Sequence, residues 1–151
     1  MGLKIDYGHK ANLALDTWVK LARASSSFNK KSIDNIRSFG LTQPQFGVIE
    51  ALGHLGPMKI GVLCSKMLVS GGNMTLVLDN LEKLDLIERV HSQEDRRAIL
   101  IQLTKNGSDL FKKVFSNHAE FVSSLMSVLT EKEQKELGKL LKKLGLGLNS
   151  Q

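Results

Sequence analysis

The sequence predicts a mainly α-helical fold that carries one small β-hairpin, which places it in the α+β class. Two observations predict it. Apolar residues recur with the helical period through most of the chain, and two short runs, 86–91 and 98–103, read as strands around the polar loop 92–97. With 151 residues, of which 42% are apolar, the chain can bury one real core, so we expect a single domain over 1–151.

A long helix is expected over about 10–39, and a second helix begins close behind it. Gly40 is a plausible stop for the first. Thr42 can cap the second, with Gln45 at the position that completes a capping box. This second helix ends near Gly53 or Gly56. The apolar positions of the first helix are Leu15, Trp18, Val19, Ala22, Ile33 and Ile36.

Two shorter helices are expected before the hairpin. One covers 60–68 and packs through Val62, Leu63 and Met67. The other starts at Ser70, a good N-cap, and reaches about Leu84. Its apolar stripe is Met74, Val77, Leu78, Leu81 and Leu84. Its opposite face is left to Gly72, Thr75, Leu76, Asp79, Asn80 and Lys83.

Two helices follow the hairpin. Thr104 caps a long one, and Thr130 with Glu133 forms a second capping box that opens the last. Three helices followed by a hairpin make a winged helix, here over about 42–104. The terminal helices, about 10–39 and 105–147, carry apolar stripes that so short a chain has too little surface to cover. We therefore expect them to form a dimerisation region between two copies.

Composition bounds the partners and the compartment. A net charge of +6 hints at a polyanionic partner, but residues 57–104 carry as many acidic as basic side chains. If this section reads DNA, it does so with a few placed residues. No apolar run is long enough to cross a membrane, and the N-terminus does not look like a signal peptide. With a single cysteine and hence no internal disulfide, we expect a cytoplasmic protein.

Metal and redox chemistry have weak support. The histidines are dispersed, so we expect no metal site and no cofactor. Cys64 lies within the short helix 60–68 beside Leu63. We expect a buried, inert core cysteine there rather than an oxidant sensor, because reactivity needs exposure.

The segment 70–83 could read duplex DNA. The N-terminus of a helix offers backbone N–H groups and a positive dipole end to phosphate oxygens, and Gly71 and Gly72 would allow close approach. Asn73 can pair with an adenine edge, and Thr75 and Leu76 can touch a thymine methyl group. The alternative is a simple turn followed by a solvated polar face.

The hairpin loop adds cations at its tip. Arg96 and Arg97 could reach the narrow minor groove, where the negative potential is enhanced. Asp95 would then brace a guanidinium through a charge-assisted contact. Taken alone, this loop is equally compatible with a solvated charged turn.

Five motifs in order give the chain a family resemblance. They are LTQPQF at 41–46, SGGNMT at 70–75, LEKLDLIER at 81–89, DRR at 95–97 and LTKNG at 103–107. Together they resemble the MarR family of winged helix-turn-helix regulators over roughly residues 10–145. The resemblance implies a homodimer on double-stranded DNA, with 70–83 as recognition helix, Arg97 in the minor groove, Asp95 as its brace and Arg96 on a phosphate. The implied DNA-binding residues are Ser70, Gly71, Gly72, Asn73, Thr75, Leu76, Asn80, Lys83, Asp95, Arg96 and Arg97.

The resemblance also implies repression that a small effector relieves. The SGGN start of the recognition helix is similar to a subgroup associated with quinone or phenolic stress. The candidate effector-binding residues are Trp18, Phe46 and Ile49, with Arg23 or His9 as polar partners. Ordinary core and interface packing is the alternative for all of them.

Two other classes of function were weighed. The sequence shows no nucleotide-binding glycine loop, nucleophile elbow or clustered metal ligands, so we do not expect an enzyme. A winged helix can also serve as a protein-interaction module, and the neutral charge of 57–104 is compatible with that. The wing distinguishes a DNA-binding protein from a protein-interaction module, because an interaction module has no need of a braced arginine pair.

Overall fold

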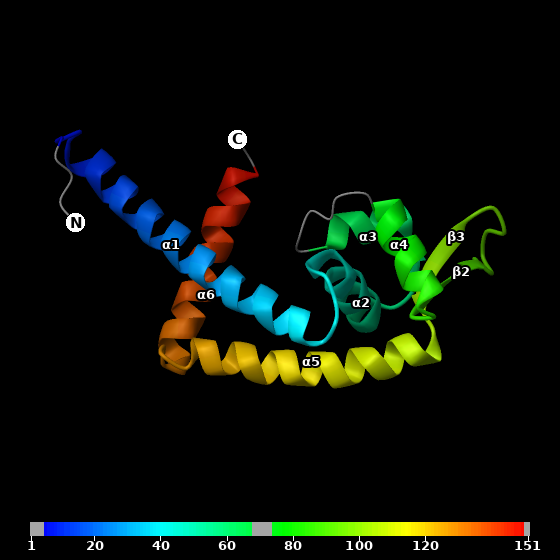
Figure 1. Cartoon of the computed structure of the whole chain (residues 1–151). Coiled ribbons are helices and arrows are strands. Elements are labelled where there is room, and N and C mark those ends of the chain that lie inside the picture. The colour runs from blue at the N-terminus through cyan, green and yellow to red at the C-terminus, as the bar shows by residue number, and fades with distance from the viewer. Residues whose placement is uncertain (1–4, 68–73, 150–151) are drawn as a thin grey trace. The chain divides into compact units, whose positions relative to one another are not determined.

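The computed structural model describes residues 5–67 and 74–149 (Figure 1). The chain divides into two compact units, Met1–Phe115 and Ser116–Gln151, which are described separately. The mainly helical class with a small antiparallel sheet is confirmed. In order, the elements are α1 (His9–Ser38), α2 (Gln43–Leu55), β1 (Met58–Lys59), α3 (Ile60–Lys66), α4 (Met74–Lys83), β2 (Ile87–His91), β3 (Ile99–Leu103), α5 (Lys105–Met126) and α6 (Glu131–Leu148).

The predicted capping box at the start of α2 is confirmed. The Thr42 hydroxyl oxygen accepts from the Gln45 backbone N–H at 3.3 Å, and the Thr42 N–H donates to Gln45 Oε1 at 2.9 Å. Two backbone donors that the helix leaves unpaired are thereby satisfied. α2 ends at Gly56, whose φ of 80° lies in the left-handed region that glycine tolerates best.

The predicted hairpin forms, and it belongs to a sheet of three strands in the order β1-β3-β2. β2 pairs with β3 antiparallel, with Arg89 opposite Ile101. β1 adds to the other side of β3, with Met58 opposite Ile101. This third strand was not predicted from the sequence, because a two-residue strand is too short to show an alternating pattern.

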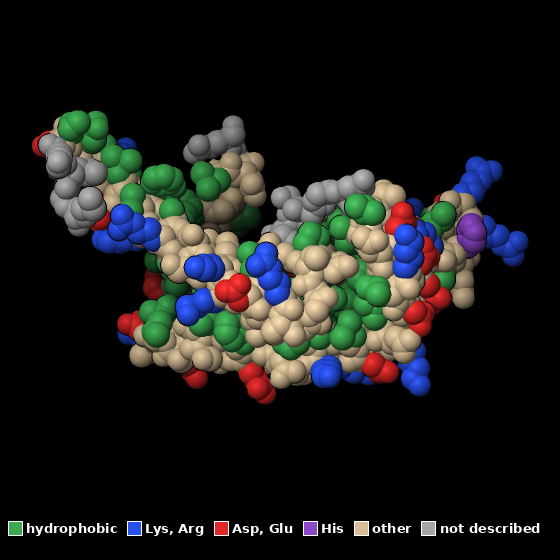
Figure 2. Space-filling view, viewed as in Figure 1, with side chains coloured by type: hydrophobic (Ala, Val, Ile, Leu, Met, Phe, Trp, Pro, Cys, Tyr) green, Lys and Arg blue, Asp and Glu red, His purple; other side chains and the backbone are tan. Residues whose placement is uncertain are grey.

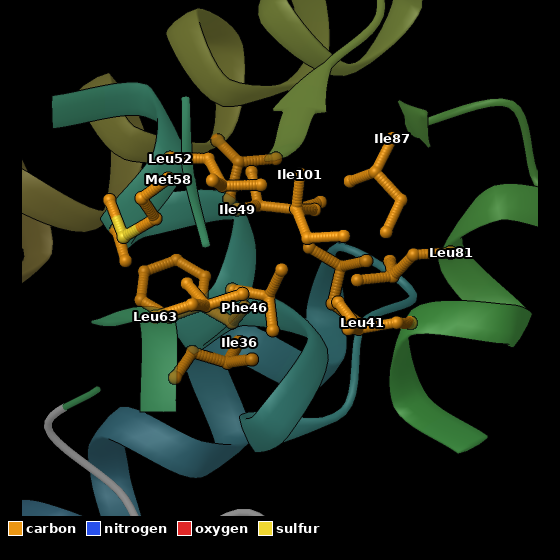
Figure 3. Close-up of a cluster of buried hydrophobic side chains, with 14 residues drawn as sticks. Ile36, Leu41, Phe46, Ile49, Leu52, Met58, Leu63, Leu81, Ile87 and Ile101 are labelled. Atoms are coloured by element: carbon orange, nitrogen blue, oxygen red, sulfur yellow. The ribbon is translucent and has the colours of Figure 1, made fainter. Parts of the chain in front are cut away.

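The core of the first unit lies between α2, the helices α3 and α4, and the sheet (Figure 3). α2 supplies more of it than any other element, since Phe46, Val48, Ile49, Ala51 and Leu52 are all buried. The other buried apolar residues of this cluster are Ile36, Leu41, Met58, Leu63, Leu78, Leu81, Ile87, Ile101 and Val114. The stripe on α4 is thus correct for Leu78 and Leu81, but Leu84 is exposed.

Cys64 corrects one expectation. The cysteine is exposed and not buried. Its neighbour Leu63 is the residue of α3 that faces the core, and the next helical position turns about 100° away from it. Val62, on the other side of Leu63, is exposed for the same reason.

A tight connection joins α4 to β2 and α5. Asp85 takes a left-handed conformation with φ 55°. Its carbonyl oxygen accepts from the Thr104 hydroxyl at 2.6 Å, and its Oδ2 accepts from the Asn106 side chain, also at 2.6 Å. The Thr104 oxygen in turn accepts from the Gly107 N–H at 3.0 Å, so the predicted cap on α5 is present.

The second unit holds the C-terminal part of α5 and all of α6. The predicted capping box at Thr130 is confirmed, with the Thr130 N–H donating to Glu133 Oε2 at 2.8 Å. These contacts hold the pKa of the Glu133 carboxyl below its usual value. No residue of α6 is buried, and its large apolar side chains are exposed: Leu137, Leu140, Leu141, Leu144, Leu146 and Leu148.

Neither a membrane span nor a metal centre is found within 5–67 and 74–149. No helix there combines the length and the apolar character that crossing a bilayer requires. The same residues contain no cluster of three or more His, Cys, Asp or Glu side chains that could hold a metal ion.

Candidate nucleic-acid interface

One face of α4 is available for contact with a large partner. Leu78 and Leu81 are fully buried on the core side of the helix. Thr75, Asn80 and Lys83 are exposed on the other side. Leu76 and Glu82 are exposed as well, and Leu76 has 55% of its surface accessible. Four of the predicted DNA-binding residues, Ser70, Gly71, Gly72 and Asn73, lie outside the described residues.

The wing loop between β2 and β3 is a turn held by hydrogen bonds among its own residues. The Ser92 backbone N–H donates to the Ala98 carbonyl oxygen at 2.9 Å, and the Ala98 N–H donates to the Asp95 carbonyl oxygen at 2.8 Å. The Ser92 hydroxyl oxygen accepts from the backbone N–H groups of Glu94 and Asp95. Local side-chain to backbone bonds of this kind stabilise turns that carry no regular structure. The tip of the wing is therefore held in shape by its own residues.

Asp95 braces the wing differently from what the sequence suggests. Its Oδ1 accepts from the backbone N–H of Arg97 at 3.0 Å. The ion pairs found among the described residues do not join Asp95 to either arginine. The carboxylate thus fixes the path of the main chain at Arg97 and forms no ion pair with the exposed Arg97 side chain.

Both wing arginines are exposed, and basic side chains project from this end of the molecule (Figure 2). A further contact that was not predicted from the sequence lies at the base of the loop, where His91 Nδ1 is 3.0 Å from the Arg96 carbonyl oxygen. Because a carbonyl only accepts, this nitrogen carries the proton. The bond ties the end of β2 to the loop next to the arginine pair.

A bridge of ion-paired side chains links α4 to the base of the wing. Arg89 on β2 donates from Nη2 to Asp79 Oδ1 at 2.7 Å and from Nη1 to Glu82 Oε2. The hydrogen bond that Arg89 donates to Asp79, followed by the charges of both carboxylates, raises the pKa of the Arg89 guanidinium above its ordinary value. These ion pairs were not predicted from the sequence. The spacing of two acids one helical turn apart, with an arginine in the next strand, was the available signal.

The acidic residues that flank this bridge also have hydrogen-bond partners. Glu88 Oε1 accepts from the Gln102 side chain at 2.8 Å across the β2–β3 pair. Asp85 closes the turn to α5 through Asn106, as described above. Of the six acidic side chains in 57–104, five therefore have partners within the fold.

The candidate effector residues lie in two different environments. Phe46 and Ile49 belong to the buried core cluster, at 6% and 2% exposure. Trp18 is 64% exposed on α1, and Arg23 and His9 are exposed on the same helix. The structure does not bring these two groups together around one cavity among the described residues.

Comparisons with known proteins agree with this arrangement. Residues 41–99, from the start of α2 to the start of β3, match the family model described as MarR family. The HTH-type transcriptional regulator MhqR of Bacillus subtilis (strain 168) is 34% identical over 133 residues, which cover 88% of this chain and 92% of that protein. The HTH-type transcriptional repressor MdtR of the same organism is 28% identical, over 87% and 85% of the two chains.

A solved structure shows the same fold. AbsC, a MarR family transcriptional regulator from Streptomyces coelicolor, superposes with a TM-score of 0.80. The match covers 97% of this chain and 100% of that one, at 20% identity. The winged helix predicted over about 42–104 therefore has its counterpart in a known architecture.

Proposed function

The chain belongs to the MarR family of DNA-binding transcriptional regulators, and from this premise we propose that it represses transcription as a homodimer on a pseudo-palindromic operator. In the proposed complex each subunit places α4 in the major groove and the β2–β3 wing at the adjacent minor groove. The two half-sites would lie about one helical turn apart on one face of the duplex. Such a regulator would act in the cytoplasm.

The braced wing is the observation that carries this proposal. Asp95 fixes the main chain at Arg97, and Arg96 and Arg97 are exposed. An arginine inserted into a narrow minor groove gains from the enhanced negative potential there. Lys83 and Asn80 on the exposed face of α4 are suited to phosphate and base-edge contacts.

The exposed apolar side chains of the terminal helices support the homodimer. On α1, Leu13 and Trp18 are 59% and 64% exposed. On α6, Leu140 and Leu144 are 53% and 47% exposed. Rows of large apolar side chains facing water are typical of surfaces that a partner covers. A second copy of the chain, with its own two rows, fits a closed symmetric pair.

Repression and its release are the finer parts of the proposal. The relative MdtR is named a repressor, which supports the same direction of control here. We propose that a small phenolic or quinone-like effector releases the DNA, with Trp18 and Arg23 on α1 as its first candidate contacts. Such a ligand would act by favouring a spacing of the two winged helices that no longer matches the operator.

A fluorescence-anisotropy titration tests the DNA-binding core of this proposal. The probe is duplex DNA from the region upstream of the protein's own gene, with a scrambled duplex as reference, at several salt concentrations. We expect tighter binding to the promoter duplex, a strong salt dependence, and weakening by Arg97→Ala. A dimer with no DNA preference and no effect of Arg97→Ala would instead favour a protein-interaction module. Turnover of any substrate would contradict our view that the protein is not an enzyme.

A further inference from the structure

The ion-paired residues between α4 and β2 form a bridge with two arms. Asp79 and Glu82 lie three positions apart on α4, and one guanidinium, that of Arg89, reaches both through separate nitrogens. The three side chains are 44%, 41% and 30% exposed. A planar guanidinium holds two carboxylates in fixed directions, which a lysine ammonium cannot do.

This bridge sits where the wing leaves the core. On the face of β2 that packs against α4, Ile87 is fully buried, Arg89 is partly buried, and His91 is exposed. Side chains on one face of a strand alternate with period two, so these three residues follow one another outward. On this face of β2, Arg89 is thus the last residue before the loop 92–97 that is at least partly buried.

Stability alone is a weak reason for such a bridge. Partly exposed ion pairs contribute only about 0–1 kcal/mol to folding, because solvent screens them. Asp79 also lies on the side of α4 proposed to face DNA, where a carboxylate is repelled by phosphates. A carboxylate at this position is explained if the bridge orients the helix and the wing relative to each other.

We infer that Arg89 is a positioning residue for DNA recognition. By bridging Asp79 and Glu82, it holds α4 and the β2–β3 wing in a fixed orientation relative to each other. The inference rests on the proposed function, since it concerns how the two DNA-contacting parts are held together. It assigns no DNA contact to Arg89 itself. Breaking the bridge from either end should therefore damage specific recognition more than general attraction to DNA.

Two variants break the bridge with opposite changes of charge. Arg89→Met removes one positive charge, and the double variant Asp79→Asn/Glu82→Gln removes two negative charges. The operator is first selected from a random duplex library with the wild-type homodimer. The quantity measured is the ratio of the dissociation constants for a scrambled duplex and the selected operator. We expect each variant to lower this ratio by about tenfold, although only the double variant binds scrambled DNA more tightly.

The double variant decides between positioning and plain electrostatics. If the carboxylates merely repel DNA, their neutralisation tightens binding to both duplexes equally and leaves the ratio unchanged, and the inference is overturned. The matched control Glu131→Gln/Glu136→Gln removes the same charge from exposed positions on α6 and should preserve the ratio. Arg89→Lys keeps the positive charge but lacks the planar guanidinium that reaches two carboxylates. It should therefore lower the ratio as Arg89→Met does.

The outcomes separate the inference from the function on which it rests. If the wild-type protein enriches no sequence from the library, the proposed function fails and the inference fails with it. If an operator is found and both bridge variants keep the wild-type ratio, only the inference fails. Should Arg89→Met not fold, as thermal melting by circular dichroism would reveal, the double variant and Arg89→Lys still give the answer.

Discussion

Gly107 lies so close to the backbone of Leu86 that a Cβ atom built on it would be 1.9 Å from the Leu86 carbonyl oxygen. The two residues belong to the first turn of α5 and to the connection that leads into β2. The same carbonyl accepts from the Thr104 N–H at 3.2 Å. The wing and α5 are therefore joined by a close backbone contact that leaves no space for a side chain.

We expect Gly107→Ala to destabilise the protein by about 1–3 kcal/mol, because backbone atoms must move to admit the methyl group. Urea unfolding at fixed protein concentration measures the change. Gly138→Ala on α6 is the matched control, since a Cβ there meets nothing within 4 Å. That variant should be stabilised by about 0.5–1 kcal/mol from helix propensity alone. Equal effects of the two substitutions would refute the role of the close contact.

Asp85 has a positive φ, so its substitutions should rank by conformational tolerance. Asp85→Ala combines a left-handed backbone that alanine disfavours with loss of the bond from Asn106, and should cost about 1–2 kcal/mol. Asp85→Asn keeps both an acceptor and tolerance of this conformation, and should cost less. Chemical denaturation of the two variants checks the order; equal costs would show that the charge of Asp85, which both variants remove, is the stabilising feature.

The same relationships show which parts of the fold the sequence could predict. The capping boxes at Thr42 and Thr130 were predictable, because each is built from two residues three positions apart. The helical stripe of α4 and the β2–β3 hairpin follow from period alone. β1 was not predictable, because its two residues become a strand only by pairing with β3, more than forty positions away.

For the candidate site, the sequence could nominate residues, but it could not predict the contacts between them. Arg97 and Asp95 are adjacent in sequence, yet whether the carboxylate meets the guanidinium or the backbone depends on the geometry of the turn. The bridge at Arg89 depends on the reversal at Asp85 that lays β2 back along α4. Cys64 was misplaced because one helical step separates a core position from an exposed one.

The brace in the wing leads to a prediction about Asp95. Asp95→Ala removes the acceptor for the Arg97 N–H and should weaken operator binding by about tenfold, although it also removes a negative charge near DNA. Asp95→Asn keeps an acceptor oxygen and should bind nearly as the wild type does. Fluorescence anisotropy with the selected operator measures both.

Glu94→Ala is the control for Asp95, because it removes the same charge from the neighbouring exposed position in the loop. It should bind DNA at least as tightly as the wild type, through reduced repulsion of phosphates. If Asp95→Ala and Glu94→Ala tightened binding alike, charge would outweigh the brace, and the wing's shape would not depend on Asp95.

His118 on α5 should make the fold sensitive to acid. It is only 9% exposed, and burial lowers the pKa of its imidazole below the usual value of about 6.5. The unfolded chain therefore takes up a proton at higher pH than the folded one does. The contribution of His118 to stability is complete above about pH 6.5 and is lost as the pH falls through that value toward the lower, folded-state pKa.

The variant His118→Gln isolates this contribution, because every other titrating group is common to the two proteins. We expect the stability of wild type relative to the variant to decrease as the pH falls from 8 to 5, measured by urea unfolding at fixed protein concentration. Glu50 cannot produce this trend, since burial raises the pKa of its carboxyl and favours the folded state on acidification. Parallel pH profiles for the two proteins would show that His118 does not titrate differently on folding.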